Sequence, residues 1–169
     1  VHAVFLLHGL WGYQEHMFSL RDALTSRARN DGAAIDIYCS HSYEGTRTYD
    51  GVDVCADRAI AEVHAHISKL TAQGKAVDRF SILGFSLGGL IARLVVYKLK
   101  SEGFFDRVTP CNFATFASPA IGIPKTPGLI SHWIQGFSAF FLSRTGTHLY
   151  LRDRRPETGN PLVYDLATP

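Results

Sequence analysis

One serine of this chain has the setting of a nucleophile, because a glycine stands two positions away on either side of it. The motif is Gly-Phe-Ser-Leu-Gly at 84–88, and its serine is Ser86. An apolar run precedes the motif, and apolar positions at helical spacing follow it over 87–100. A serine on such a sharp strand-to-helix turn projects its hydroxyl above the sheet edge. The pattern predicts nucleophilic chemistry at Ser86, and a turn that cradles a phosphate or merely packs tightly is the alternative.

Two backbone N–H groups are expected to stabilise the oxyanion that such a nucleophile creates. One is the N–H of Leu87, at the N-terminus of the predicted helix. The other is the N–H of Leu10, in the loop that follows an apolar strand near the start of the chain. The same loop supplies three further binding candidates, which are His8, Gly9 and Trp11. A lone histidine at a strand end is more often a structural hydrogen-bonding group than a proton carrier.

Alternating strands and helices must position these groups. Apolar runs and amphipathic spacing predict strands at 2–8, 34–39, 79–85 and 111–116, and helices at 14–30, 52–73 and 87–100. This order predicts a mostly parallel sheet with right-handed crossovers and helices on both faces. The fold class is α/β, of the α/β-hydrolase type, in a single domain over 1–169.

The composition narrows the classes of function. The formal net charge is +2, and no basic run is interleaved with aromatic residues, so nucleic acid is not an expected partner. The cysteines at 39, 55 and 111 lie in apolar segments and are expected to be buried free thiols in a reducing compartment. No apolar run is long enough to span a bilayer. The sequence calls for no metal and no organic cofactor, because the loop at 40–51 lacks a recognisable ligand spacing.

The segment 129–142 carries large apolar side chains without charge. As a helix it would present a broad aromatic face that includes Trp133, Phe137 and Phe141. Such a face fits a core helix that packs on the sheet. It fits equally a lid or a helix that lies at a lipid interface, since amphipathicity does not distinguish the two environments.

The base and the acid that would complete a catalytic triad are harder to place. In α/β-hydrolases the acid follows the serine, and the histidine follows the acid. The histidines after Ser86 are His132 and His148, and neither follows a predicted strand. His148 is a candidate base by order alone, because Asp106 precedes it but lies before the next strand. We expect the chain to stop before the last strands, which carry the acid and the base.

Beyond the serine motif, the chain resembles a family of serine esterases that includes fungal lipid-droplet phospholipases and lipases. The stretch Glu-Gly-Thr-Arg-Thr-Tyr-Asp-Gly-Val-Asp-Val-Cys at 44–55 is similar to the family's signature, as are 103–107, 112–119 and 145–153. The resemblance covers nearly the whole chain. It implies an α/β-hydrolase acting on acyl esters of lipids, with Ser86 as the nucleophile, Leu10 and Leu87 in the oxyanion hole, and the acid and base beyond Pro169.

These observations together predict a serine hydrolase that cleaves carboxylic esters of lipids through an acyl-enzyme on Ser86. The expected location is intracellular, in the cytoplasm or at a lipid-droplet or membrane surface. A thioesterase or an acyltransferase is the alternative within enzymes, since another acceptor can resolve an acyl-enzyme. A non-catalytic lipid-surface module is the alternative from another class. Acyl length, head group and oligomeric state stay open.

Overall fold

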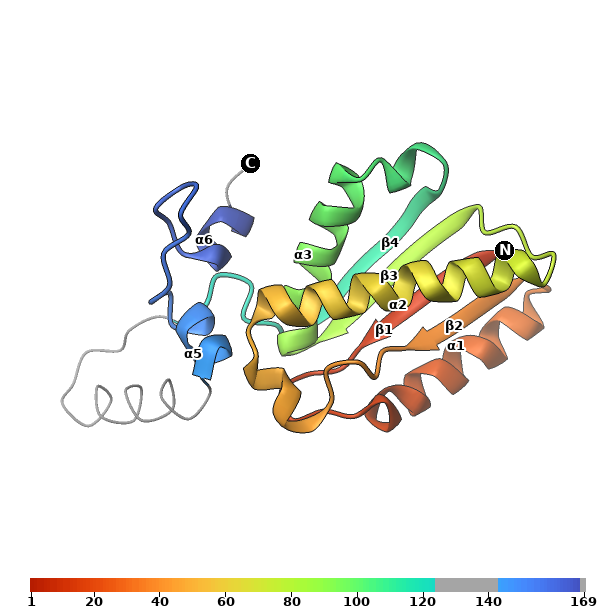
Figure 1. Cartoon of the computed structure of the whole chain (residues 1–169). Helices are drawn as coiled ribbons and strands as arrows, with labels where there is room; N and C mark the ends of the chain where they lie inside the picture. The colour runs from red at the N-terminus through yellow and green to blue at the C-terminus, as the bar shows by residue number, and fades with distance from the viewer. Residues whose placement is uncertain (124–142, 168–169) are drawn as a thin grey trace.

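Parallel strands form the centre of the structure, a computed structural model that describes residues 1–123 and 143–167 (Figure 1). The strands of the described residues are β1 (His2–Leu7), β2 (Ile35–Cys39), β3 (Arg79–Phe85) and β4 (Thr109–Phe116). They pair in the order β2-β1-β3-β4, with every neighbouring pair parallel. The predicted strands and their parallel arrangement are therefore confirmed. The predicted helix at 129–142 lies outside the described residues.

Helical segments connect the strands, as the spacing of apolar residues predicts. They are η1 (Gln14–Met17), α1 (Phe18–Asn30), η2 (Gly45–Tyr49), α2 (Val52–Ala72), α3 (Leu87–Ser101), η3 (Phe104–Asp106), α5 (Ser143–Leu149) and α6 (Leu162–Ala167). The predicted helix at 14–30 is divided into a 3-10 turn, η1, and the α-helix α1. The loop predicted at 40–51 contains the 3-10 turn η2.

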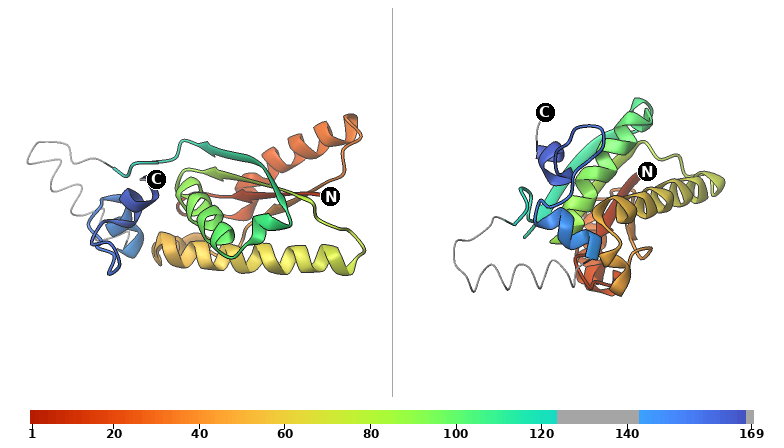
Figure 2. Two further views of the ribbon diagram at one scale, coloured as in Figure 1. Left: turned by 90° about the horizontal axis from the view of Figure 1, so that it is seen from above. Right: turned by 60° about the vertical axis from the view of Figure 1, so that its left-hand side comes forward.

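The helices cover both faces of the sheet (Figure 2). Alternate strand residues point to opposite faces, so β1 contributes Phe5 to one core and Leu6 to the other. The larger core lies between the sheet and the helices α2 and α3, and it includes Ile82 and Leu90. The smaller core lies under α1 and includes Met17. Because the strands are parallel, the carboxyl ends of β1, β2 and β3, which precede α1, η2 and α3, lie at the same end of the sheet.

β4 is an edge strand of the described sheet, and most of its residues are exposed. Cys39 and Cys55 are buried free thiols, as predicted. The prediction that Cys111 is buried was wrong, because this residue lies on β4 and is exposed. An apolar run of sequence does not distinguish a central strand from an edge strand that is covered on one side only.

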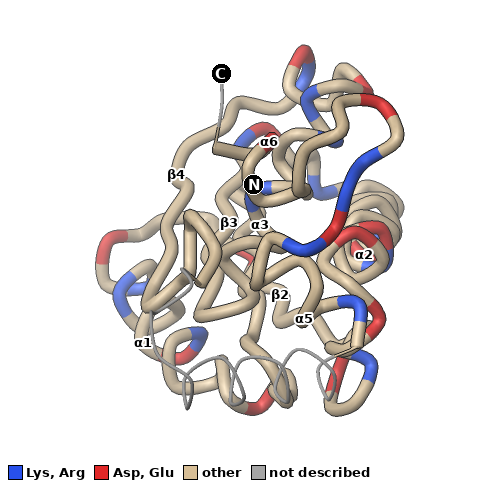
Figure 3. Tube along the Cα trace, turned by 90° about the vertical axis from the view of Figure 1, so that its left-hand side faces the viewer, with Lys and Arg blue, Asp and Glu red and all other residues tan. Residues whose placement is uncertain are grey.

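The carboxyl end of the sheet faces the viewer in Figure 3. A run of charged residues, 152–155, passes along one side of this end between α6 and α2 (Figure 3). In the described part of the chain, no helix has the length and apolar character needed to cross a membrane.

Candidate functional site

Ser86 lies on a strained turn between β3 and α3. Its backbone angles are φ 54° and ψ −121°, which a residue other than glycine rarely adopts. The glycines of the motif are required by close contacts. A Cβ at Gly84 would lie 2.3 Å from the carbonyl oxygen of Gly88, and one at Gly88 would lie 2.4 Å from that of Leu7. The strand, sharp turn and helix that the motif predicts are therefore all present.

Backbone hydrogen bonds hold this turn while leaving its hydroxyl unused. The N–H of Ser86 donates to the carbonyl of Phe116 at 2.8 Å, and the N–H of Gly89 donates to the carbonyl of Ser86 at 3.0 Å. Within the described residues, the Oγ of Ser86 makes no hydrogen bond. The hydroxyl thus stands at the carboxyl end of a parallel sheet, which is where ligands bind in folds of this type.

The N–H of Leu87 is a backbone donor at the start of α3, directly after Ser86. Leu87 is the first residue of α3, a helix of 15 residues. The first N–H groups of a helix have no acceptor inside the helix and lie at the positive end of its dipole. Among the described residues, no acceptor outside the helix takes the N–H of Leu87. This donor therefore stays available next to the Ser86 hydroxyl.

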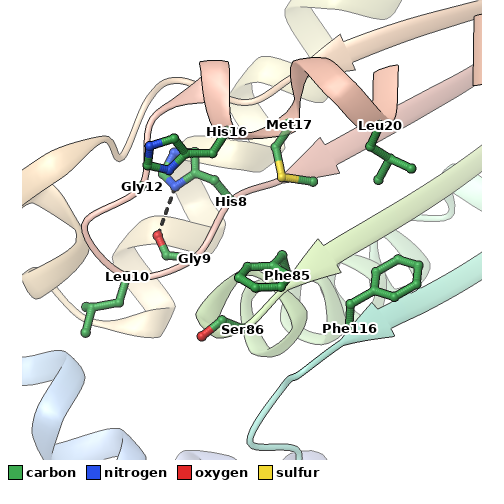
Figure 4. A pocket seen from close by; sticks show the side chains of 10 residues that line it. All are labelled: His8, Gly9, Leu10, Gly12, His16, Met17, Leu20, Phe85, Ser86 and Phe116. Carbon is green, nitrogen blue, oxygen red and sulfur yellow. Dashed lines mark hydrogen bonds between the residues drawn. The ribbon is translucent and has the colours of Figure 1, made fainter. Parts of the chain in front are cut away.

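The orientation of the Leu10 N–H follows from the peptide group it shares with the carbonyl of Gly9. That carbonyl accepts hydrogen bonds from His8 Nδ1 and from the N–H of Gly12, both at 3.0 Å (Figure 4). In a trans peptide the N–H points opposite to the C=O, so the Leu10 N–H points away from His8. The loop contacts the nucleophile directly, because a Cβ at Gly9 would lie 2.9 Å from the Cβ of Ser86.

His8 orients this loop from a fully buried position. Its ring packs on Tyr43 with 4.4 Å between ring centroids. Burial lowers the pKa of His8 below its ordinary value, although the hydrogen bond to Gly9 opposes the shift. Because a carbonyl oxygen can only accept, Nδ1 carries the proton of the neutral ring. The Nε2 atom has no partner among the described residues.

A cavity of about 530 Å³ opens beside Ser86 (Figure 4). Met17 and Leu20 line it from the side of α1, and Phe85 and Phe116 line it from the strand ends. The full lining consists of His8, Gly9, Leu10, Gly12, His16, Met17, Leu20, Phe85, Ser86 and Phe116. No carboxylate or lysine side chain is among these described residues, so the cavity suits an apolar group.

Of the residues that the sequence singles out, His8, Gly9, Leu10 and Ser86 gather around this cavity. Trp11 is 57% exposed, and the described lining does not include it. His148 lies elsewhere. It is buried against the start of α2, where its Nδ1 accepts the N–H of Val52 at 3.1 Å.

His148 is thus not brought to Ser86. Burial lowers its pKa, and the nearby carboxylates of Asp153 and Asp53 oppose that shift. The other downstream histidine, His132, lies outside the described residues. In residues 1–123 and 143–167, no three His, Cys, Asp or Glu side chains form a group that could hold a metal ion.

Comparison with known proteins gives both a family and a fold. The family model described as "Putative serine esterase (DUF676)" matches residues 1–169. Two proteins of Saccharomyces cerevisiae are similar in sequence. "Putative lipase YDL109C" is 34% identical over 99 residues, which are 54% of this chain and 14% of that protein. "Putative lipase ROG1" is 33% identical over 95 residues, which are 55% of this chain and 13% of that protein.

A solved structure, "Phospholipase PlaB from Legionella pneumophila in complex with thio-NAD", is similar in fold. Its TM-score is 0.63 at 15% identity, and the match covers 98% of this chain and 33% of that one. At this identity the likeness concerns the fold alone, and it confirms the predicted α/β-hydrolase class. This chain spans only a minor part of the length of each of these proteins.

Proposed function

The chain belongs to the DUF676 family of serine esterases, and from this membership we propose that it carries the nucleophile and oxyanion hole of a lipid-ester hydrolase. Ser86 is the proposed nucleophile, and the N–H groups of Leu10 and Leu87 are the proposed oxyanion donors. The observation that carries the proposal is the strained turn at Ser86, with the Gly9 loop packed directly against it. Strain of this kind persists where the surrounding structure maintains it for a function.

The proposed reaction has two steps. The Oγ of Ser86 attacks the ester carbonyl carbon, its proton passes to a base, and the alcohol leaves with that proton while the acyl group stays on Ser86. Water, deprotonated by the same base, then attacks the acyl carbon and releases the carboxylic acid and the free serine. In both steps the carbonyl oxygen becomes negative, and preorganised N–H donors lower the barrier by stabilising that charge.

We place the base of this reaction outside the described residues. The histidines that line the cavity are His8 and His16. The Nδ1–H of His8 is held by the Gly9 carbonyl, and the Nδ1 of His16 accepts the N–H of Tyr13 at 3.5 Å. Neither ring hydrogen-bonds to Ser86. The proposed activity therefore belongs to the whole polypeptide in which these residues occur.

An apolar acyl chain fits the cavity best. Its described lining is dominated by apolar side chains. Large apolar residues are also exposed around it, with Trp11 57%, Phe85 49% and Phe116 47% exposed. Exposed apolar side chains around a pocket are typical of surfaces that bind a membrane, a protein or an apolar ligand. We propose that these residues contact the lipid surface while one acyl chain enters the cavity.

A fluorophosphonate probe tests the nucleophile. We expect the whole polypeptide to gain one probe mass on Ser86, and Ser86→Ala to gain none. Ser101→Ala, which removes an exposed hydroxyl of the same helix, is the matched control and should label like the wild type. Circular dichroism shows whether each variant is folded. Labelling that persists in folded Ser86→Ala would refute the assignment, and labelling of residues 1–169 alone would place the base within them.

Hydrolysis of p-nitrophenyl esters tests the substrate class. We expect kcat/KM to rise with acyl length until the cavity is filled, and Ser86→Ala to lose the activity. Partition of the acyl group to added alcohols separates a hydrolase from an acyltransferase. Binding to liposomes without any esterase activity in the folded wild type would instead favour a lipid-surface module.

A further inference from the structure

The first turn of α2 is capped by residues that come much later in the sequence. The residue before this helix is Gly51, which has no side chain to cap it. The N–H of Gly51 donates to Thr145 Oγ1 at 3.0 Å, and the N–H of Val52 donates to His148 Nδ1 at 3.1 Å. Both partners belong to α5, which lies beside the start of α2 (Figure 1).

The Thr145 hydroxyl also reaches η2. While it accepts from Gly51, it donates to the carbonyl of Thr48 at 2.5 Å. Thr145 and Thr48 are both 0% exposed, so water does not compete for these bonds. A hydroxyl has one proton to donate, and here that proton is committed to Thr48. Loss of this hydroxyl would leave a buried carbonyl and a buried N–H without their partner.

The opposite side of η2 holds the loop at Ser86. The Oγ1 of Thr48 donates to the carbonyl of Gly45 at 2.6 Å and accepts the N–H of Trp11 at 3.3 Å. The N–H of Gly45 donates to the carbonyl of Gly12 at 3.0 Å, and the indole N–H of Trp11 donates to the hydroxyl of Tyr49. η2 therefore lies between α5 and the loop that carries Leu10.

We propose that Thr145 is a positioning residue for the oxyanion hole, and that it acts through Thr48 on the peptide group that follows Leu10. Trp11 has φ 54°, a conformation that needs support from its surroundings. Its N–H belongs to the Leu10–Trp11 peptide group, so the bond to Thr48 fixes the backbone on one side of Leu10. His8 fixes the Gly9–Leu10 peptide group on the other side. The inference rests on the proposed function of the Leu10 N–H.

A purely structural role for Thr145 predicts a different result. If the hydroxyl only stabilised the start of α2, its loss would lower the melting temperature and leave the turnover of folded molecules unchanged. If it positions Leu10, its loss weakens an interaction that forms with the oxyanion and not with the ground-state ester. Such a loss lowers kcat and leaves KM unchanged.

The test compares Thr145→Val with Thr145→Ser in the whole polypeptide. Valine keeps the shape and removes the hydroxyl, whereas serine keeps the hydroxyl. We expect kcat to fall about tenfold in Thr145→Val with KM within about twofold, which is less than the loss of a whole oxyanion donor. Thr145→Ser should recover the wild-type kcat. Thr147→Val is the matched control, because the exposed Thr147 hydroxyl donates to the carbonyl of Arg144 within α5 and has no other hydrogen-bond partner in the described part of the chain.

Deuterium exchange gives a readout that does not depend on catalysis. We expect a peptide that covers 9–14 to exchange about tenfold faster in Thr145→Val, with β1 unchanged as the internal reference. An unchanged kcat in folded Thr145→Val, or unchanged exchange over 9–14, would overturn the inference. If the wild type hydrolyses no ester, the proposed function fails, while the exchange result still decides whether Thr145 holds this loop.

A second variant covers the case in which Thr145→Val does not fold. Thr48→Val removes the acceptor of the Trp11 N–H from the other end of the same chain of contacts. We expect the same selective loss of kcat, and an unchanged kcat in this variant would equally overturn the inference. Where both variants fold, the double variant should lose no more than Thr48→Val alone, because residues of one network are not additive.

Discussion

Lowering the pH from 7.5 to 5.5 is expected to destabilise the fold, because two histidines are buried as neutral rings. His8 and His148 are 0% and 6% exposed, and burial lowers the pKa of each below 6.5. Below pH 6.5 the unfolded chain takes up these protons more readily than the folded chain does. The stability that the neutral rings contribute is therefore fully present above pH 6.5. It is lost as the pH falls from 6.5 toward the lower pKa of the folded state.

The size of this loss follows from proton linkage. A group that is protonated only in the unfolded state changes the free energy of unfolding by at most about 1.4 kcal/mol per pH unit. Two such groups therefore remove at most about 2 kcal/mol between pH 6.5 and 5.5. Nearby carboxylates reduce this loss because they favour the charged ring: Glu44 and Glu62 act on His8, and Asp153 and Asp53 act on His148. Positive charge on His16 disfavours the charged form of His8, and Arg144 disfavours that of His148.

Urea unfolding at pH 7.5, 6.5 and 5.5 measures the loss. His8→Asn is the informative variant, because an asparagine side chain does not titrate and its amide can still donate to the Gly9 carbonyl. We expect this variant to lose less stability than the wild type between pH 6.5 and 5.5, by up to about 1 kcal/mol. His64→Asn, which replaces a half-exposed histidine, should keep the wild-type loss. An equal loss in His8→Asn and the wild type would refute the reasoning.

Three further substitutions test a close glycine contact at the Ser86 turn, its control, and the hydrogen bonds of the loop at 40–44. Gly88→Ala is expected to lower the free energy of unfolding by about 3 kcal/mol, because its Cβ would lie 2.4 Å from the Leu7 carbonyl oxygen. Gly74→Ala, with nothing within 4 Å, should cost about 1 kcal/mol for its positive φ, and urea unfolding compares the two. Glu62→Gln is expected to cost about 2 kcal/mol and to speed deuterium exchange over 40–44, since its carboxylate accepts two backbone N–H groups of that loop. Unchanged exchange there would contradict this role.

The parts of the site that the sequence predicts correctly depend on neighbours in the chain. The turn at Ser86 needs small residues at two fixed offsets, and a Cβ at Gly84 would lie 2.3 Å from the carbonyl oxygen of Gly88, four residues later. The parallel order of the strands follows from the alternation of apolar runs with helical segments. Such features can be predicted because their physical causes lie within a few residues.

The contacts that the sequence does not predict join distant segments. Thr145 and His148 bond to residues 94 and 96 positions earlier, and no periodicity or motif indicates that pairing. Order along the chain made His148 a candidate base, whereas its Nδ1 is occupied at the start of α2. The exposure of Cys111 likewise depends on which strand lies at the sheet edge, and local hydrophobicity does not specify that.

Leu10 lies between two peptide groups that are fixed by different parts of the chain. His8 holds the preceding group and is itself a neighbour in sequence, whereas Thr48 holds the following group and depends on α5. The two anchors reach Leu10 through separate contacts, so Thr145→Val should loosen the Thr48 side and leave the hydrogen bond from His8 to Gly9 in place. Acid pH cannot replace this test, because a protonated His8 ring keeps its Nδ1–H and still donates to the Gly9 carbonyl. A turnover number that falls in Thr145→Val at constant pH, with KM unchanged, therefore has its cause on the Thr48 side of Leu10.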